Sequence, residues 1–172
     1  MKDLLVVDGY NFIFNFYRAG KLRSADLEYL KDQLILDLSA YGSQKKCSIS
    51  VVFDAKGGSS KLRSSETVDN IKVIHSREGE TADTVIEELV NKWSDQRRVF
   101  VVTSDYTQQK VVFGKNTTRK SSREFGLEIN SVKENIRQAV MENKKRSGRG
   151  FYPLEKRLDP NIRKKISDLR KK

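Results

Sequence analysis

The sequence has very few of the side chains on which many catalytic and metal-binding chemistries depend. Its 172 residues include one cysteine, Cys47, and one histidine, His75. A single cysteine excludes a disulfide framework and a cysteine-based zinc site. A single histidine excludes mechanisms that need a histidine pair for acid–base catalysis. Catalysis by this chain must therefore use carboxylates, hydroxyls, amides, lysines or a metal ion held by oxygen ligands.

Long apolar runs are also missing. No run approaches the roughly 18 residues that a membrane-spanning helix needs. The N-terminal sequence MKDLLVVDGYN is too short and too acidic for a signal peptide, and no transit-like stretch precedes it. We therefore expect no membrane contact and a cytoplasmic location, in a bacterium or an organelle derived from one.

Positive charge is abundant instead. The chain has 34 basic and 23 acidic residues and a net charge of +11, which predicts an acidic partner, nucleic acid first and an anionic membrane surface second. Residues 139–172 hold 12 basic and 4 acidic side chains and carry +8, whereas residues 1–138 carry +3. This basic arm favours polyanion binding, and a solvated tail that aids solubility is the alternative.

The apolar residues predict an α/β fold with a mainly parallel central sheet. Four short runs rich in β-branched residues lack polar alternation, as expected of strands covered on both faces: Leu4–Val7, Ile49–Phe53, Ile71–Ile74 and Val99–Val102. Apolar residues spaced by three and four predict helices between and after them, over Leu27–Tyr41, Ala82–Trp93 and Phe125–Val140. Ser24 is expected to cap the first helix and Gly42 to end it, and the third is expected to begin near Ser121. Alternating strands and helices imply right-handed crossovers.

Two polar segments interrupt this pattern. Lys56–Asp69 contains two glycines and four serines, which predicts a mobile loop. Lys144–Gly150, with the sequence KKRSGRG, predicts a basic linker before a short last helix. We therefore expect one domain over residues 1–143, followed by a linker and a short helix over residues 144–172.

Aspartates follow three of the four predicted strands. Asp8, Asp54 and Asp105 stand at or just after strand ends, and Asp83 falls in the first turn of the helix after the third strand. Because the carboxyl ends of parallel strands meet at one edge of a sheet, we expect these four side chains to converge. A divalent cation would relieve their mutual repulsion, and oxygen ligands without histidine or cysteine favour Mg²⁺ or Mn²⁺.

Each of these polar residues also has an ordinary structural interpretation. Aspartate is common in turns and helix caps, and Asp83 could simply complement a helix dipole. Asn11 could be a turn residue, or it could bond a carboxylate or a phosphate. Thr81 and Ser104 could be caps, or they could orient the carboxylates. The coincidence of four aspartates favours a metal site over four separate caps.

Five motifs together resemble a known nuclease family. They are DGYN after the first strand, VVFDA at the second, ETAD before a helix, TSDYT at the fourth strand and RKSSREF at the start of the long helix. In this order and spacing they are similar to the NYN branch of the PIN-like nucleases, most closely to the bacterial YacP-like group, over roughly residues 3–143. That group includes a ribosome-dependent messenger-RNA endonuclease. The resemblance implies a PIN-like three-layer α/β/α sandwich and an acidic site, dependent on Mg²⁺ or Mn²⁺, that cleaves single-stranded RNA.

The resemblance also implies roles for individual residues. It places the acidic positions of the family at Asp8, Asp54, Asp83 and Asp105, and the asparagine of its first motif at Asn11. We expect Asp8, Asp83 and Asp105 to hold the metal ion, and Asp54 to complete its shell or position the attacking water. Attack by metal-activated water would leave 5′-phosphate and 3′-hydroxyl ends.

Basic and aromatic residues near these motifs and in the arm are candidates for binding RNA and the ribosome. They are Tyr10, Tyr106, Lys110, Arg119, Lys120, Arg123, Lys144, Lys145 and Arg146. Basic side chains would meet phosphates and tyrosines would stack on unpaired bases, whereas ordinary partial burial and a solvated helix start are the alternatives. Cations have the wrong sign for a helix N-terminus, which favours phosphate contacts. We expect a monomer that docks on the ribosome.

Other classes of protein fit the sequence less well. A non-catalytic RNA- or ribosome-binding protein of the same fold stays open, because its acids could serve only as caps. A haloacid-dehalogenase-type phosphatase is disfavoured, because its chemistry needs a second aspartate two residues after the first, where Tyr10 stands. Gly57, Gly58 and Lys61 do not form a Walker nucleotide site.

Overall fold

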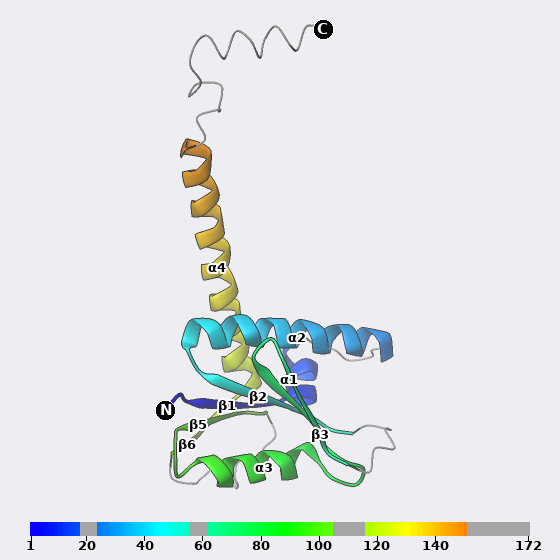
Figure 1. Cartoon of the computed structure of the whole chain (residues 1–172). Helices are drawn as coiled ribbons and strands as arrows, with labels where there is room; N and C mark the ends of the chain where they lie inside the picture. The colour runs from blue at the N-terminus through cyan, green and yellow to red at the C-terminus, as the bar shows by residue number, and fades with distance from the viewer. Residues whose placement is uncertain (18–23, 56–61, 105–115, 151–172) are drawn as a thin grey trace, which may run out of the picture. The chain divides into compact units, whose positions relative to one another are not determined.

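The structure, a computed structural model, contains a six-stranded sheet. It describes residues 1–17, 24–55, 62–104 and 116–150, with the backbone alone for Ser24, Ala25 and 145–150. The chain divides into two compact units, Met1–Lys133 and Glu134–Lys172. Unit 1 holds the sheet, whose strand order is β3-β4-β2-β1-β5-β6 (Figure 1). The strands are β1 Leu4–Asp8, β2 Ser48–Phe53, β3 Ser64–Val68, β4 Ile71–His75, β5 Val99–Val102 and β6 Thr117–Lys120.

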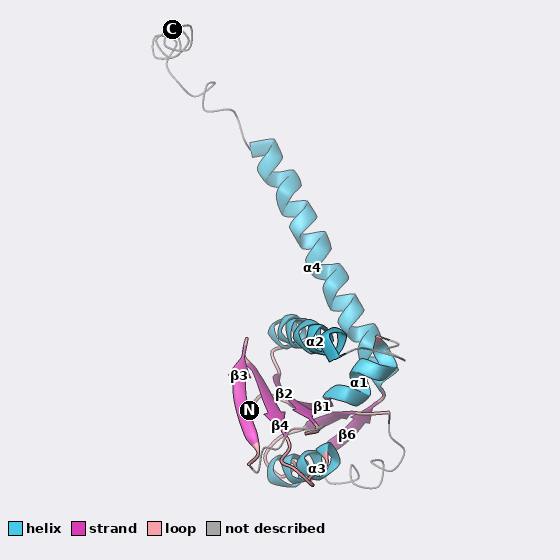
Figure 2. Ribbon diagram, turned by 90° about the vertical axis from the view of Figure 1, so that its right-hand side faces the viewer, coloured by secondary structure: helices cyan, strands magenta, loops and turns pink. Residues whose placement is uncertain are grey.

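Helices cover both faces of this sheet. They are α1 Gly9–Phe16, α2 Ser24–Lys45, α3 Ala82–Trp93 and α4 Ser122–Gly150. Figure 2 shows α3 on one face and α1 and α2 on the other. The first turns of α4 join the α1–α2 side, because Phe125 and Ile129 share a buried cluster with Phe12 of α1 and Leu34 of α2. The predicted three-layer α/β/α sandwich is confirmed.

Parallel pairing brings the ends of five strands to one edge of the sheet. β1 pairs with β2 and β5, β2 pairs with β4, and β5 pairs with β6, all in parallel. Alternate residues of β1 face opposite ways: Leu5 and Val7 join the cluster under α1 and α2, while Leu4 and Val6 join the cluster under α3. All four predicted strands are confirmed, because their β-branched runs are buried on both faces. We call the edge where these strands end the carboxyl edge, and the edge where they begin the amino edge.

The predicted loop over residues 56–69 is wrong for its second half, which forms β3. This strand runs antiparallel to β4, and four of its five residues are exposed. Asp69 and Asn70, at φ 48° and 66°, connect the two strands through left-handed backbone, as a two-residue hairpin turn requires. An exposed edge strand needs no apolar residues, so the hydrophobic pattern did not indicate it.

The boundaries of other elements also differ from those expected. Ser24 is the first residue of α2 instead of a cap before it, and α2 passes Gly42 to end at Lys45. Lys46 then takes left-handed backbone at φ 55°, a common end to a helix. Arg119 and Lys120 lie on β6 and not at a helix start, so the argument from the helix dipole does not apply to them.

The long helix α4 is buried only in its first part. Phe125, Ile129 and Val132 are in the core, whereas Ile136 and Val140, which belong to the same predicted stripe, are 43% and 48% exposed. The helical backbone continues through residues 144–150, the segment expected to be a linker. Residues 151–172, with the expected last helix, lie outside the described residues. Within the described part of the chain, every helix is too short or too polar to cross a bilayer.

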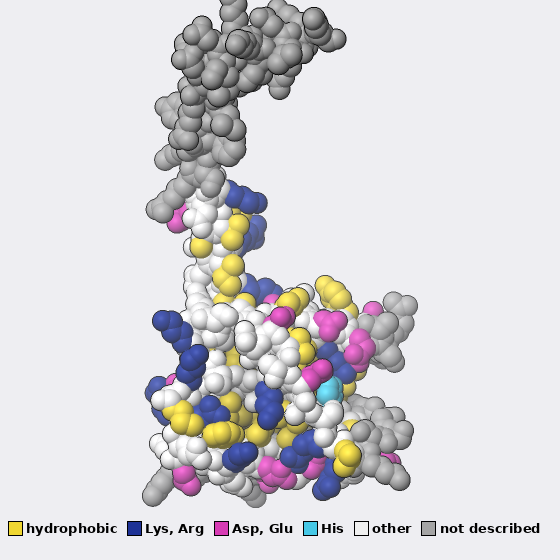
Figure 3. All heavy atoms as spheres, in the orientation of Figure 1, with side chains coloured by type: hydrophobic (Ala, Val, Ile, Leu, Met, Phe, Trp, Pro, Cys, Tyr) yellow, Lys and Arg dark blue, Asp and Glu magenta, His cyan; other side chains and the backbone are white. Residues whose placement is uncertain are grey.

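The charge of unit 1 is mixed over its surface. Figure 3 shows both basic and acidic side chains on the visible face, with apolar patches among them. Several charged residues of unit 1 pair with each other, including Arg98 with Asp3 at 2.8 Å and Lys31 with Glu28 at 2.7 Å. This pattern agrees with the near-balanced charge of residues 1–138, so the excess positive charge of the chain belongs to its C-terminal part.

Candidate active site at the carboxyl edge

Asp8 ends β1 and caps the helix that follows without a break. Its backbone is extended, at φ −72° and ψ 103°, and its Oδ1 accepts a hydrogen bond of 3.1 Å from the backbone N–H of Asn11. The carboxylate is only 8% exposed. The DGYN motif is therefore a strand end joined to the first turn of α1, which holds this buried carboxylate at the carboxyl edge.

Gly9 in the same motif has a packing role. A Cβ atom there would overlap the aromatic ring of Phe53, the last residue of β2. Phe53 is 1% exposed and belongs to the core. Glycine thus allows α1 to start close against the end of β2, next to Asp54.

Asn11 connects three elements through one carbonyl oxygen. Its Oδ1 accepts hydrogen bonds from the backbone N–H of Ser104 at 2.9 Å and from the hydroxyl of Ser122 at 3.0 Å. Ser122, which is fully buried, also donates its backbone N–H to Oγ of Ser104 at 3.3 Å. The motif asparagine therefore fixes the end of β5 and the start of α4 against α1. Ser122 was not expected in this network, because only the fold brings it to Asn11.

Asp54, just after β2, is oriented by a serine from the neighbouring strand. The Ser76 hydroxyl donates to Asp54 Oδ1 at 3.1 Å and accepts from the backbone N–H of Ala55 at 3.0 Å. Ser76 is 1% exposed, and its own N–H donates to the carbonyl of Phe53 at 3.0 Å. Nothing in the local sequence indicated Ser76, since it reaches Asp54 only through the pairing of β2 with β4.

Asp83 and Thr81 lie at the start of α3. Thr81 is the N-cap and accepts a 3.3 Å hydrogen bond from the backbone N–H of Thr84, so the capping interpretation holds for Thr81. Asp83 is half-buried in the first turn of α3. Nearby Glu80 bonds Arg63 at 2.5 Å and 3.1 Å, and this contact lowers the pKa of Glu80.

The connectivity identifies where these groups should form a site. From β1 the chain passes through α1 and α2 to β2, and from β4 it returns through α3 to β5 on the other side of β1. Such a reversal of strand order opens a crevice beyond the carboxyl ends of β1 and β5. Asp8 and Ser104 come from those two strands. Asp105, the residue after Ser104, lies outside the described residues.

The donor chemistry at this edge suits a hard cation. Asp8, Asp54 and Asp83 offer only carboxylate oxygens, the ligands that Mg²⁺ and Mn²⁺ prefer. Within the described residues, no group of three or more acidic, histidine or cysteine side chains is arranged closely enough to hold a metal ion. Asp105, the fourth carboxylate predicted for the metal site, lies outside the described residues.

A row of rings lies beside these carboxylates and was only partly foreseen. Tyr10 stacks on Phe14 at 6.2 Å and meets Phe53 edge-on at 5.2 Å, and Phe53 stacks on His75 at 5.6 Å. Lys31 of α2 lies 5.5 Å from the Tyr10 ring and 5.4 Å from the Phe53 ring. Of these five residues, which we call the aromatic ledge, the sequence predicted only Tyr10.

The titration of two ledge residues is coupled. Burial, with the positive charge of Lys31, lowers the pKa of His75. Burial opposes the charge of Lys31 as well, but hydrogen bonds to Glu28 and Tyr10 outweigh it and raise the pKa of this lysine. At neutral pH the ledge therefore presents one cation, Lys31, beside a neutral imidazole.

The predicted RNA-binding cations differ in their surroundings. Lys120 pairs with Glu128 at 2.7 Å, so its charge has a partner inside unit 1. Arg119 is half-buried and its Nε has no hydrogen-bond partner among the described residues, while Arg123 is exposed. Lys144 is exposed on the part of α4 in unit 2. Tyr106 and Lys110, and the side chains of Lys145 and Arg146, lie outside the described residues.

Comparison with known proteins gives consistent matches over most of the chain. Residues 5–171 match the model of the YacP-like NYN domain. The uncharacterized protein YacP of Bacillus subtilis (strain 168) is 36% identical over 142 residues, which are 80% of this chain and 81% of that protein. The crystal structure of Rae1 (YacP) from Bacillus subtilis aligns with a TM-score of 0.71 at 32% identity, over 98% of this chain and 95% of that one. A point mutant of Rae1 aligns with a TM-score of 0.70 at 33% identity, over 83% of each chain.

Proposed function

Because the chain belongs to the YacP-like NYN domain family, we propose that it is a metal-dependent endoribonuclease that cleaves single-stranded RNA. The observation that carries the proposal is the placement of Asp8, Asp54 and Asp83 on elements that end or begin at one edge of the sheet. The five motifs that resemble NYN and PIN-like nucleases, and the three-layer fold, support the same activity.

Each residue of the carboxyl edge would have its own role in cleavage. Asp8, Asp83 and Asp105 would hold Mg²⁺ or Mn²⁺, which would supply charge stabilisation at the scissile phosphate and a lowered pKa for water. Asp54, held by the Ser76 hydroxyl at 3.1 Å, would position the attacking water. The backbone N–H of Asn11 fixes Asp8, and the Asn11 side chain fixes the strand end that carries Ser104. The expected products carry 5′-phosphate and 3′-hydroxyl ends.

The aromatic ledge supports a single-stranded substrate. Unpaired bases can stack on aromatic side chains whatever their sequence, whereas a paired duplex hides its base faces. Phe14 is 39% exposed and Tyr10 is half-buried, so both present some surface on α1, the helix that Asp8 caps. In this proposal Arg119 and Arg123 meet the RNA backbone, and the basic arm docks on ribosomal RNA so that messenger RNA is cut on the ribosome in the cytoplasm.

The test is cleavage of a labelled messenger RNA with and without ribosomes, in Mn²⁺, Mg²⁺ or EDTA, with the cut ends mapped. The wild-type chain should cut only with a metal ion, and Asp8→Asn should not cut. Asp32→Asn, which removes an exposed carboxylate of α2, is the matched control and should cut normally. Full activity of Asp8→Asn in Mg²⁺ would overturn the assignment.

A second candidate function keeps the fold without the chemistry. Asp8 and Thr81 both act as helix N-caps, as a non-catalytic RNA- or ribosome-binding protein would also need. Such a protein would bind ribosomes equally well in EDTA and would show no response to Mn²⁺ titration. Removal of residues 144–172 should abolish ribosome co-sedimentation at moderate salt under either function, because the arm supplies the docking charge in both.

A further inference from the structure

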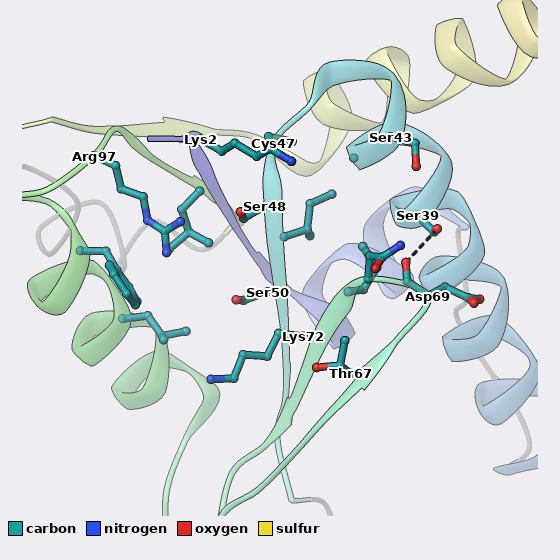
Figure 4. Close-up of a pocket in the computed structure, with 17 residues that line it drawn as sticks. Lys2, Ser39, Ser43, Cys47, Ser48, Ser50, Thr67, Asp69, Lys72 and Arg97 are labelled. Carbon is teal, nitrogen blue, oxygen red and sulfur yellow. Dashed lines mark hydrogen bonds between the residues drawn. The ribbon is translucent and has the colours of Figure 1, made fainter.

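A cavity of about 530 Å³ lies at the amino edge of the sheet, far along the strands from the carboxylates. Its lining includes Ser48 and Ser50, which open β2, together with Lys72 of β4 and Trp93 and Arg97 at the end of α3. We call the part bounded by these five residues the α3 pocket. Figure 4 shows both serine hydroxyls, the Lys72 ammonium group and the Arg97 guanidinium pointing into the same space.

The pocket exists because β2 and β4 carry polar side chains at the amino edge of the sheet face under α3, whereas β1 and β5 stay apolar there through Leu4 and Val99. Further along the strands, that face carries Val6, Val52, Ile74 and Val101, which pack against α3. At the amino edge Ser48 and Ser50 stand on the same side of β2 as Val52, and α3 has already ended at Trp93. Two small side chains and a finished helix leave room that apolar packing does not fill.

Ser50 places a hydroxyl group in the wall of the cavity. The residue is 5% exposed, and Figure 4 shows its hydroxyl pointing into the cavity. A hydroxyl can donate a hydrogen bond to an oxyanion or accept one from a donor. Ser50 can therefore contact a polar ligand inside the pocket.

Arg97 is held in place without a carboxylate. Its guanidinium carbon lies 4.1 Å from the centre of the Trp93 ring, and its Nε is buried with no hydrogen-bond partner in the part of the chain that the structure describes. Burial lowers the pKa of this arginine, but the group stays charged at neutral pH. Stacking leaves the outer N–H groups of a guanidinium free to bind an oxyanion in two places.

The net charge of the pocket is positive. Neither Lys72 nor Arg97 pairs with an acidic side chain of the described residues. Asp69 also lines the cavity, but Figure 4 shows its carboxylate turned toward α2 and away from Ser50. Lys2 adds a further cation to the lining. The dipole at the end of α3 favours a cation at Arg97. It does not explain why Lys72 and Ser50 also direct polar groups into the pocket.

We infer that the α3 pocket binds the phosphate group of a nucleotide, through Arg97, Lys72 and the hydroxyls of Ser48 and Ser50. All four groups can donate hydrogen bonds, as a phosphate requires of its partners. The whole cavity, which also reaches Ser39 of α2, is larger than one phosphate and within the range of small-ligand sites. Leu89 in its lining offers apolar surface for a base. The same phosphate chemistry could come from a free mononucleotide or from one nucleotide of an RNA strand. This inference does not rest on the cleavage proposed above.

The experiment follows backbone amide NMR signals of the full chain during titration with inorganic phosphate, adenosine monophosphate and a six-nucleotide single-stranded RNA. Saturable shifts centred on Ser50, Lys72 and Arg97 are expected. Binding of the mononucleotide would identify a free nucleotide as the source, and binding of RNA alone would identify the strand backbone.

Variants inside and outside the pocket test which side chains bind the ligand. Lys72→Gln and Arg97→Gln should each weaken binding at least about fivefold, since each removes one charge-assisted contact. Lys45→Gln and Arg98→Gln remove the same charge from exposed residues of the amino edge outside the pocket lining and should change binding less than about twofold. Ser50→Ala removes only a hydroxyl and should weaken binding by about twofold or more. The inference is overturned if no ligand shifts these amides, as in a water-filled pocket, or if all four charge variants weaken binding equally.

Discussion

The two edges of the sheet carry opposite chemistry. The carboxyl edge holds Asp8 and Asp83 at the starts of α1 and α3, whereas the amino edge holds Lys45 in the last turn of α2 and Arg97 just after α3. In strand–helix units every helix starts at one edge and ends at the other, and its dipole favours anions at its start and cations at its end. One sheet can thus place a cation-binding site and an anion-binding site at a distance from each other, using the same repeated unit.

The largest expected difference between the edges is in cleavage. Asp8→Asn should lower the cleavage rate by at least about 100-fold, since it removes a charged metal ligand from the proposed site. Lys45→Gln, which removes a cation of the amino edge outside the α3 pocket, should leave the rate within about twofold. Rates on the same messenger RNA with ribosomes measure both. Equal losses would show that the two edges do not act separately.

The polar network at the carboxyl edge should matter for stability. Asn11→Ala leaves the Ser104 N–H and the buried Ser122 hydroxyl without their acceptor, so we expect a loss of about 2–3 kcal/mol in the free energy of unfolding. Asn91→Ala, which removes an exposed amide of α3, should change it by less than about 0.5 kcal/mol. Urea unfolding measures both, and a neutral Asn11→Ala would show that the network does not hold the edge together.

Two glycines should respond differently to alanine. At the carboxyl edge, Gly9→Ala places a methyl group in the Phe53 ring, and we expect a loss of about 1–3 kcal/mol. At the amino edge, the Cβ of Gly42→Ala would stand 3.1 Å from Cδ1 of Ile49, while alanine favours the helix by about 0.5–1 kcal/mol, so the net change should be near zero. Thermal unfolding measures the change in stability of the two variants. A larger loss of stability for Gly42→Ala would show that packing is tighter around Gly42 than around Gly9.

The smallest expected effect is a dependence of stability on pH. It belongs to the carboxyl edge alone, because His75 at the end of β4 is the only histidine. Its pKa is lowered in the folded chain by burial and by Lys31. The unfolded chain therefore takes up this proton first as the pH falls, and stability is full above about pH 6.5 and declines below it, by less than about 1 kcal/mol. His75→Gln should remove this decline. Unfolding midpoints between pH 8 and 5 measure it, and an unchanged slope in the variant would assign the dependence elsewhere.

The sequence predicted the buried strands and missed the exposed ones. β1, β2, β4 and β5 are apolar because helices cover both of their faces, so their residues alone identified them. β3 and β6 are polar edge strands. The helix α1 was missed for another reason: it is buried through Phe12 and Ile13, but its eight residues, which begin directly after Asp8, are too few to show a helical period. Whether an exposed polar segment forms an edge strand depends on the strand with which it pairs, and the composition of the segment does not reveal that partner.

The sequence likewise indicated some residues of the candidate site and not others. Asp8, Asp54 and Asp83 could be found from their positions relative to apolar runs. Ser76 and Lys31 could not, since each comes from an element distant in sequence and reaches its partner only in the folded chain. The pairing of Lys120 with Glu128 was unforeseen for the same reason.

The polar character of β3 and β6 has a consequence for self-association. These are the two outermost strands of the described sheet, and an outermost strand is a template on which another chain can add a strand of its own. β3 has the sequence SSETV and β6 the sequence TTRK. A second copy that docked β3 on β3, or β6 on β6, would bring like charges together at Glu66 or at Arg119. The same polar residues that concealed these strands from the hydrophobic pattern therefore oppose pairing between like edges of two copies, in keeping with the expected monomer.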